Sequence, residues 1–220
     1  MQLIQLIIDG VASGCIYGLV ALGFVLIYKA TETINFAQGD ILMLGAFVAF
    51  SLIGVLGMNY VVGFILTVMI IAVFGFFLDA VVVRQIIGQP AFATVMLTIG
   101  LGFIFRGFAS IYWGTDIFSF STPFSGKITE VGGLIISYVN ISIIVGTTLL
   151  MGILFAFFSF TKIGVAMRAS SENQLAAYYM GIPVKFIFSL IWSISAGVAA
   201  IAGVLLAPIT LVDTSISLIG

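Results

Sequence analysis

Six long runs of apolar residues, separated by short polar joints, constrain the fold of this 220-residue chain more than any other feature. A helix needs roughly 20 mostly apolar residues to cross a bilayer at 1.5 Å per residue. Backbone polar groups find no water inside a bilayer, so each run is expected to be a helix. The sequence therefore predicts an all-α, polytopic transmembrane helix bundle of about six spans. The runs are Leu3–Tyr28, Ile41–Gly57, Tyr60–Val83, Ala91–Trp113, Leu134–Phe160 and Phe186–Ala207.

The composition argues against a soluble domain and against several kinds of site. Charged residues make up 7% of the chain, whereas a soluble domain carries about a quarter. The net charge of −1 offers no basic surface for nucleic acid. The chain has no histidine and one cysteine, Cys15. Zinc sites, disulfide frameworks and Ser-His-Asp or Cys-His catalytic sets are therefore excluded, and we expect no metal site.

The basic residues of the joints predict the orientation of the bundle. Because the chain crosses the membrane at each run, the joints Lys29–Asp40, Arg84–Pro90 and Thr161–Lys185 share one side. Cytoplasmic joints are enriched in Lys and Arg, so this side is expected to be cytoplasmic and the N-terminus external. The opposite side has Lys127 alone, whereas the predicted cytoplasmic side has Lys29, Arg84, Lys162, Arg168 and Lys185.

Small residues form stripes on two of the predicted helices. Gly10, Gly14 and Gly18 recur at intervals of four in the first run, and Gly197 and Gly203 lie among serines and alanines in the last. Such stripes let neighbouring helix backbones approach closely. We expect both to be packing faces, with a substrate path along either as the alternative.

Charged residues inside or near the end of the third and fourth runs need an explanation. Arg106 falls within the fourth run, where an intramembrane charge is costly. Its side chain is expected to snorkel outward or form an ion pair, with a polar cavity as the alternative. Asp79 and Arg84, near the inner end of the third run, are expected to be anchors or a pair.

The joint between the first two runs has a distinctive polar sequence, Asn35-Phe36-Ala37-Gln38-Gly39-Asp40. One interpretation is an ordinary loop in which Asp40 caps the next helix, because a carboxylate suits a helix N-terminus. The other is a broken-helix element lining a water-filled path, where irregular backbone is tolerated. Under the second interpretation, Asn35, Gln38 and Asp40 are candidate path residues.

The cytoplasmic joint Gly164–Pro183 is longer than a bundle connection needs. Its spacing of small and apolar residues supports a short amphipathic helix, which Gly181 and Pro183 would end. The helix could rest on lipid. The joint has only two cations, Lys162 and Arg168, so attraction to lipid would be weak, and a surface for a soluble partner is favoured.

The chain lacks the residues of an ATPase. No Gly-x-x-x-x-Gly-Lys-Ser/Thr phosphate loop is present, since Gly126-Lys127 is followed by Ile128. Asp9, Asp40 and Asp79 all fall at the ends of predicted segments, which does not suit a mid-membrane aspartyl protease. We therefore expect a membrane subunit without enzymatic activity or a bound cofactor.

Several segments together resemble the permeases of branched-chain amino acid ABC transporters. The opening Gly14-Cys15-Ile16-Tyr17-Gly18-Leu19, the segment Asn35–Asp40, and Thr98-Ile99-Gly100-Leu101 carry the resemblance. So do Arg168-Ala169-Ser170-Ser171-Glu172 and Gly181-Ile182. The resemblance covers almost the whole chain in order, so residues 1–220 are expected to form the permease domain. Family members usually continue beyond the position of Gly220, so this chain is expected to lack the C-terminal spans.

The resemblance implies an assembly in the inner membrane. It implies a second, paralogous permease, two cytoplasmic ATPases that hold ATP and Mg²⁺, and an external substrate-binding protein. Residues 163–183 would be the coupling loop that docks on an ATPase, with Glu172 and Gly181 as signature positions. The candidate coupling residues are Arg168, Ser171, Glu172, Ala176 and Gly181.

The mechanism expected from this resemblance is alternating access. The ATPases would move Ser171–Gly181 as a lever, and the spans would rock about a path for leucine, isoleucine or valine. Thr98, Ser193 and Ser195 are further candidates for the path wall. The alternatives are a related ABC permease for urea, amides or another small polar solute, an ATP-independent secondary transporter, and a non-transporting assembly subunit. A secondary transporter would show an inverted repeat with broken helices, which we do not find.

Overall fold

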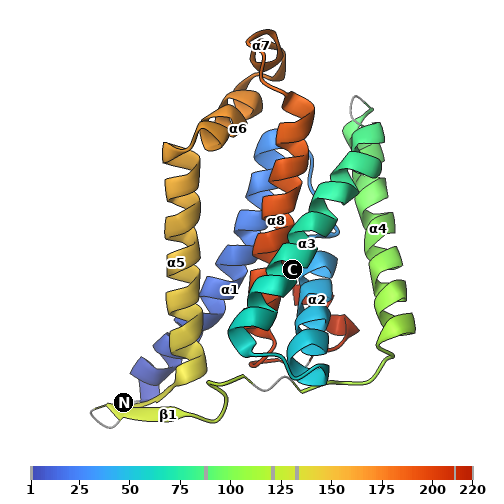
Figure 1. Ribbon diagram of the computed structural model, residues 1–220. Helices are drawn as coiled ribbons and strands as arrows, with labels where there is room; N and C mark the ends of the chain where they lie inside the picture. The colour runs from blue at the N-terminus through green and yellow to red at the C-terminus, as the bar shows by residue number, and fades with distance from the viewer. Residues whose placement is uncertain (1, 87–88, 120–121, 132–133, 211, 220) are drawn as a thin grey trace.

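The chain folds into a bundle of long helices, seen in a computed structural model (Figure 1). The structure describes residues 2–86, 89–119, 122–131, 134–210 and 212–219. Six of the helices in these ranges are long and apolar enough to cross a membrane, which confirms the predicted all-α polytopic bundle. They are α1 (Gln2–Thr31), α2 (Gln38–Ala49, extended by a π-helix over Phe50–Val55), α3 (Tyr60–Val81), α4 (Ala91–Tyr112), α5 (Tyr138–Phe160) and α8 (Val184–Leu206).

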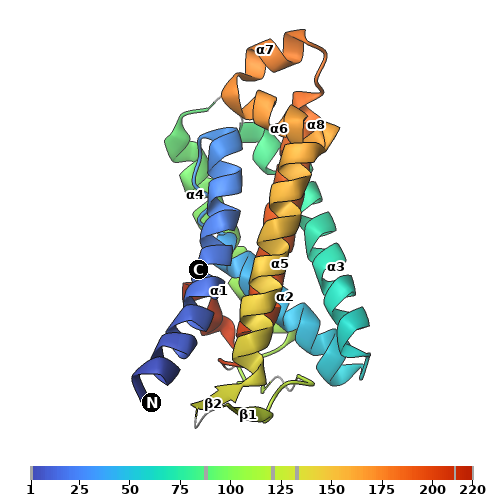
Figure 2. The same cartoon turned by 90° about the vertical axis from the view of Figure 1, so that its left-hand side faces the viewer.

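Shorter elements lie at both ends of the bundle. Helices α6 (Lys162–Glu172) and α7 (Gln174–Tyr179) connect α5 to α8 at one end. The N-terminus and a two-stranded hairpin lie at the other end (Figure 2). We call the end with α6 and α7 the cytoplasmic end, following the basic residues. Two 3₁₀ helices, Val83–Ile86 and Thr214–Ile219, follow α3 and α8.

The hairpin corrects one predicted boundary. Strand β1 (Ile128–Val131) pairs antiparallel with β2 (Leu134–Ser137), with Ile128 opposite Ser137. The run Leu134–Phe160 is therefore not one helix, because its first residues form β2. Ser137 accepts a hydrogen bond from the Val139 amide at 3.3 Å and caps α5. An apolar run alone does not distinguish a strand from the start of a helix.

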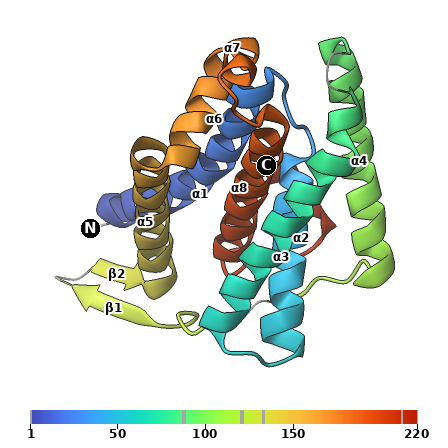
Figure 3. The ribbon, with the colours of Figure 1, turned by 45° about the horizontal axis from the view of Figure 1, so that its top comes forward.

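Helix α8 is the centre of the bundle. In its most apolar stretch, 78% of the residues are buried. Helices α1, α2 and α3 all pack against it (Figure 3). Small residues make this possible. A Cβ on Gly45 of α2 would lie 2.7 Å from the Ala200 Cα, and a Cβ on Gly203 would lie 3.2 Å from the Ala46 nitrogen. At these two crossings, the backbones of α2 and α8 are in direct contact.

Helix α2 begins inside the bundle. From the cytoplasmic end of α1, the chain turns at Glu32, which has a φ of 55°, and descends beside α8 to about the middle of the bundle (Figure 1). The helix then starts at Gln38, before the predicted Ile41. From the charge distribution, the whole joint Lys29–Asp40 is expected on the cytoplasmic side. That placement is wrong for Asn35–Asp40, which lies within the bundle.

The segment after α8 starts at the external end of the bundle and turns back against it (Figure 1). Phe118 and Val212 form a β-bridge, with N–H···O distances of 3.0 and 2.9 Å. The 3₁₀ helix Thr214–Ile219 packs against α2 and α4. Trp113 also turns inward, donating from Nε1 to the Ser51 Oγ at 2.7 Å and stacking on Phe47.

Candidate functional site

A buried polar cluster surrounds the start of α2. Asn35 Nδ2 donates to the Gln38 Oε1 at 3.2 Å, and Asn35 Oδ1 accepts from the Ala37 amide. Gln38 Nε2 donates to the Ser195 carbonyl at 3.5 Å, and Ser195 Oγ lies 2.9 Å from the Gly23 carbonyl. A Cβ on Gly23 would collide with the Gln38 amide. The cluster thus links the loop Asn35–Gln38 by hydrogen bonds and packing to both α1 and α8.

The other predicted path residues differ in how they lie. Thr98 of α4 is fully buried, and its Oγ1 accepts a hydrogen bond from the Phe36 amide at 3.2 Å. Asn35, Gln38 and Ser195 are likewise buried within the chain. Ser193 is half-buried on α8 and takes no part in the cluster. The structure therefore brings together four of the six predicted residues around the loop, and Asp40 lies next to them on α2.

Asp40 forms an ion pair inside the bundle. Arg106 Nε of α4 donates to the Asp40 Oδ1 at 2.6 Å, so Arg106 forms an ion pair rather than standing alone in its span. A Cβ on Gly102 would collide with the other carboxylate oxygen, so Gly102 lets Asp40 reach α4. The two partners differ in exposure, since the Asp40 side chain is 2% exposed and that of Arg106 is 37% exposed.

The predicted packing glycines fall into two groups. A Cβ placed on Gly203 would collide with the Leu42 carbonyl of α2, and a Cβ placed on Gly197 would make an ordinary contact with α3, 3.6 Å from the Ala72 Cβ. Gly10, Gly14 and Gly18 have nothing within 4 Å of a Cβ placed on them. These three form an open stripe along α1, on which no other part of the described chain packs closely.

The coupling segment forms two helices rather than the single helix predicted. Helix α6 is anchored by Met167, which packs with Ala30, Ile187 and Ile191 at the ends of α1 and α8. Asn173 is extended, with φ −154° and ψ 104°, and breaks the helix. Its Oδ1 then accepts from the Ala176 amide at 2.9 Å and caps α7. An asparagine favours such a cap over a helix interior.

Helix α7 projects at the cytoplasmic end of the bundle (Figure 2), and most of its apolar side chains are exposed. Ala177 is its buried residue. Gly181 has a φ of 81°, and the amides of Gly181 and Ile182 bond the carbonyls of Tyr178 and Ala177. This is a Schellman ending, so the prediction that Gly181 ends the helix is confirmed. Exposed along α7 and just beyond it are Leu175, Tyr178, Tyr179 and Met180.

The five predicted coupling residues all lie on this helix pair or its ending. Arg168, Glu172, Ala176 and Gly181 are exposed. Ser171 is half-buried and donates from Oγ to the Arg168 carbonyl at 2.9 Å. The arrangement presents charged and apolar groups together at the far end of the bundle from the N-terminus.

Asp79 and Arg84, which were expected to be anchors or a pair, form an ion pair. Arg84 Nη2 lies 3.6 Å from the Asp79 Oδ2, and Ser189 Oγ donates to the same oxygen at 2.7 Å. The pair thereby joins the cytoplasmic end of α3 to the start of α8. Within the ranges that the structure describes, no group of three His, Cys, Asp or Glu residues could hold a metal ion.

The comparison with protein families decides what kind of bundle this is. Residues 6–218 match the family described as the permease component of branched-chain amino acid transport systems. The chain belongs to this family. It is therefore a multi-pass permease of the cell membrane, with the polar loop and the projecting helix pair as its distinguishing parts.

Individual relatives agree with this placement. The chain is 28% identical over 215 residues to the high-affinity branched-chain amino acid permease protein BraD of Pseudomonas aeruginosa, covering 92% of this chain and 70% of that protein. It is 27% identical over 218 residues to LivH of Escherichia coli K12, covering 94% and 71%. A probable LivH of Methanocaldococcus jannaschii is 29% identical over 196 residues, covering 86% of this chain and 61% of that protein. None of these relatives is named for urea or amides. No solved structure matches the chain.

Proposed function

We propose that the chain is the permease subunit of an ATP-binding-cassette importer that moves branched-chain amino acids across the cytoplasmic membrane by alternating access. The family match over residues 6–218 is the observation that carries this proposal. The names of the relatives supply the substrate class, leucine, isoleucine and valine. In this proposal, the assembly contains a second permease, two cytoplasmic ATPases that hold ATP and Mg²⁺, and an external binding protein.

The ATPases would grip the helix pair α6–α7. An exposed apolar residue is expected where lipid covers the spans. Tyr179 and Met180, however, are exposed beyond the spans, on the side with most of the basic residues. An apolar surface in that position marks a protein contact. Residues 163–183 would serve as the coupling loop, with Arg168, Glu172, Ala176 and Gly181 at its surface. The anchoring of α6 by Met167 would pass its movement to α1 and α8.

The substrate path would run beside the Asp40–Arg106 pair. A guanidinium in hydrocarbon costs about 3 kcal/mol or more, so the exposed part of Arg106 is expected to face water or a partner rather than lipid. A branched-chain amino acid is a zwitterion, and a neutral ion pair can receive its charges without trapping it. Asn35, Gln38, Thr98 and Ser195 are buried inside the chain and would reach the path only if the loop moves.

The cap of α7 gives a test of coupling with a matched control. Asn173→Ala removes the cap, which costs about 1 kcal/mol and should lower leucine uptake about fivefold, because α7 frays. Asn59→Ala removes an equivalent cap from the external end of α3, where Asn59 Oδ1 accepts from the Val61 amide at 3.0 Å. Uptake of labelled leucine by proteoliposomes of the assembled transporter should fall only for Asn173→Ala.

The same assay tests the substrate class. Excess valine or isoleucine should suppress leucine uptake, and excess urea should leave it unchanged. Equal uptake by the Asn173→Ala and Asn59→Ala transporters would argue against a coupling role for α7. Suppression by urea but not by valine would argue against the substrate class.

A further inference from the structure

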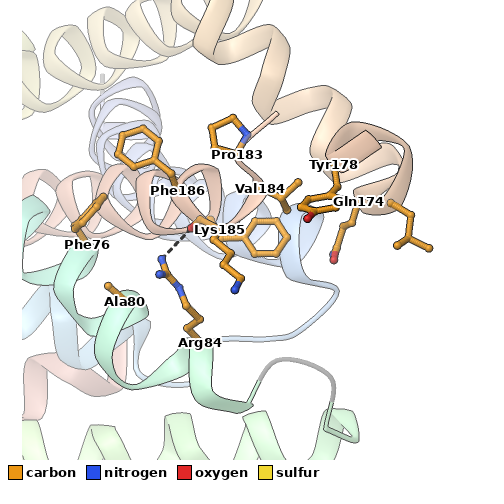
Figure 4. Close-up of a pocket in the computed structure, with 11 residues that line it drawn as sticks. Phe76, Ala80, Arg84, Gln174, Tyr178, Pro183, Val184, Lys185 and Phe186 are labelled. Atoms are coloured by element: carbon orange, nitrogen blue, oxygen red, sulfur yellow. Dashed lines mark hydrogen bonds between the residues drawn. The ribbon is translucent and has the colours of Figure 1, made fainter. Parts of the chain in front are cut away.

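A cavity of about 880 Å³ lies at the cytoplasmic end of the bundle, between the end of α3, helix α7 and the start of α8 (Figure 4). It lies apart from the polar cluster, and Leu175 and Tyr178 of α7 form part of its wall. Arg84 and Lys185 line one part of it, and both side chains point into the same region. The apolar part of its lining includes Phe76, Ala80, Phe186 and Phe188.

The apolar lining extends from the basic residues into the span of α3. Phe76 precedes Arg84 by about two helical turns, so it lies deeper in the span than the basic groups. Phe186 directly follows Lys185 in α8 and lies beside the basic groups. The ring centroids of Phe76 and Phe186 are 5.9 Å apart. The centroid of the Phe76 ring also lies 5.9 Å from that of Phe77, which is exposed. The apolar wall is thus continuous with the exposed face of α3.

The charges around the cavity leave one positive charge uncompensated. Arg84 lies beside Asp79 and donates from Nη2 to the Lys185 carbonyl at 2.9 Å. Asp79 therefore offsets Arg84. Lys185 is exposed and forms no ion pair within the part of the chain that the structure describes. A phosphodiester has one negative charge and accepts hydrogen bonds from both side chains, so it fits the remaining charge.

We propose that this cavity binds an anionic glycerophospholipid of the inner leaflet. Its phosphodiester lies against Arg84 and Lys185, and an acyl chain lies along Phe76 and Phe186. Basic pockets between helices on the cytoplasmic side are suited to such headgroups. The site needs only the membrane placement of the bundle and not its transport activity. Because Tyr178 of α7 also lines the cavity, the bound lipid steadies the helix pair.

The test measures lipid retained by the purified full-length chain. Protein is extracted into mild detergent, exchanged with an equimolar mixture of phosphatidylglycerol and phosphatidylcholine, and analysed by native mass spectrometry. The wild type should retain phosphatidylglycerol in preference to phosphatidylcholine. Lys185→Gln should lower that preference about fivefold, because one basic residue at the headgroup is lost. Lys162→Gln, an exposed cation of α6 outside the cavity, should leave it unchanged.

A second variant fills the apolar part without touching the charges. Ala80→Phe should lower retention of both lipids, and inorganic phosphate at millimolar concentration should not displace phosphatidylglycerol. Displacement by phosphate would overturn the proposal in favour of a site for free anions. Equal retention by the wild type, Lys185→Gln and Ala80→Phe would overturn it in favour of a cavity that a protein segment fills. Arg84→Gln is avoided because Arg84 also pairs with Asp79.

Discussion

Replacing Gly203 with leucine is expected to prevent the bundle from packing. A Cβ at this position would collide with the Leu42 carbonyl and lie 3.2 Å from the Ala46 nitrogen, so backbone atoms of α2 obstruct any side chain. Overpacking typically costs about 1–3 kcal/mol, and more where the obstructing atoms cannot rotate away. We expect Gly203→Leu to lose at least about 3 kcal/mol of stability. Size-exclusion chromatography in detergent should show aggregation or a melting temperature far below that of the wild type.

Gly14→Leu is the matched control for this prediction. Gly14 also belongs to a small-residue stripe on a spanning helix, but nothing lies within 4 Å of a Cβ placed there. The isolated chain should therefore keep its wild-type melting temperature. Similar losses in Gly203→Leu and Gly14→Leu would contradict the packing of α8 on α2 that the structure describes.

Breaking the Asp40–Arg106 pair is expected to destabilise the chain almost as strongly. Arg106→Gln leaves the Asp40 carboxylate, which is 2% exposed, without its cation. Removing one partner of a buried pair costs about 3–5 kcal/mol, mainly because the remaining charge is uncompensated. The double variant Asp40→Asn/Arg106→Gln retains an amide on each side and should recover most of the stability. Each single variant should therefore lose more stability than the double variant.

A double-mutant cycle on melting temperature and on leucine uptake separates packing from transport. We expect a coupling energy of at least about 2 kcal/mol between the two positions. If the path runs beside the pair, the double variant should be stable but should take up leucine slowly. If the stability losses of the two single variants simply add up in the double variant, the ion pair would be contradicted. A stable double variant with wild-type uptake would contradict the position of the path.

Much of the fold could be predicted because span length and apolar content are properties of a single segment. The six spans follow from that rule. The ending of α7 at Gly181 follows from another local rule, the preference for glycine just beyond a helix C-terminus. The break at Asn173 was missed because the surrounding residues suit one helix. An asparagine that can cap a following helix was the available signal.

The depth of the polar loop could not be predicted from residue types. Asn35–Asp40 has the composition of a surface joint, and it is held inside the bundle by partners far along the chain, such as Ser195 and Arg106. Gly23 and Gly102 make room for Gln38 and Asp40. Their positions in α1 and α4 do not distinguish them from the glycines of the open stripe. Contacts between distant helices therefore decide which polar residues become a site.

The proposed function depends most on the binding of an ATPase subunit to α7 on the cytoplasmic side, and cross-linking tests this contact most directly. Cys15 is replaced by serine, and a single cysteine is placed at Met180, which is 83% exposed beyond the end of α7. Tyr138→Cys, at the opposite end of the bundle, is the control. In native membranes, a photo-activated cross-linker attached through the thiol should join Met180→Cys to the ATPase subunit and leave Tyr138→Cys unattached to it. Cross-linking of the ATPase through Tyr138→Cys, or none through Met180→Cys while leucine uptake continues, would contradict the account.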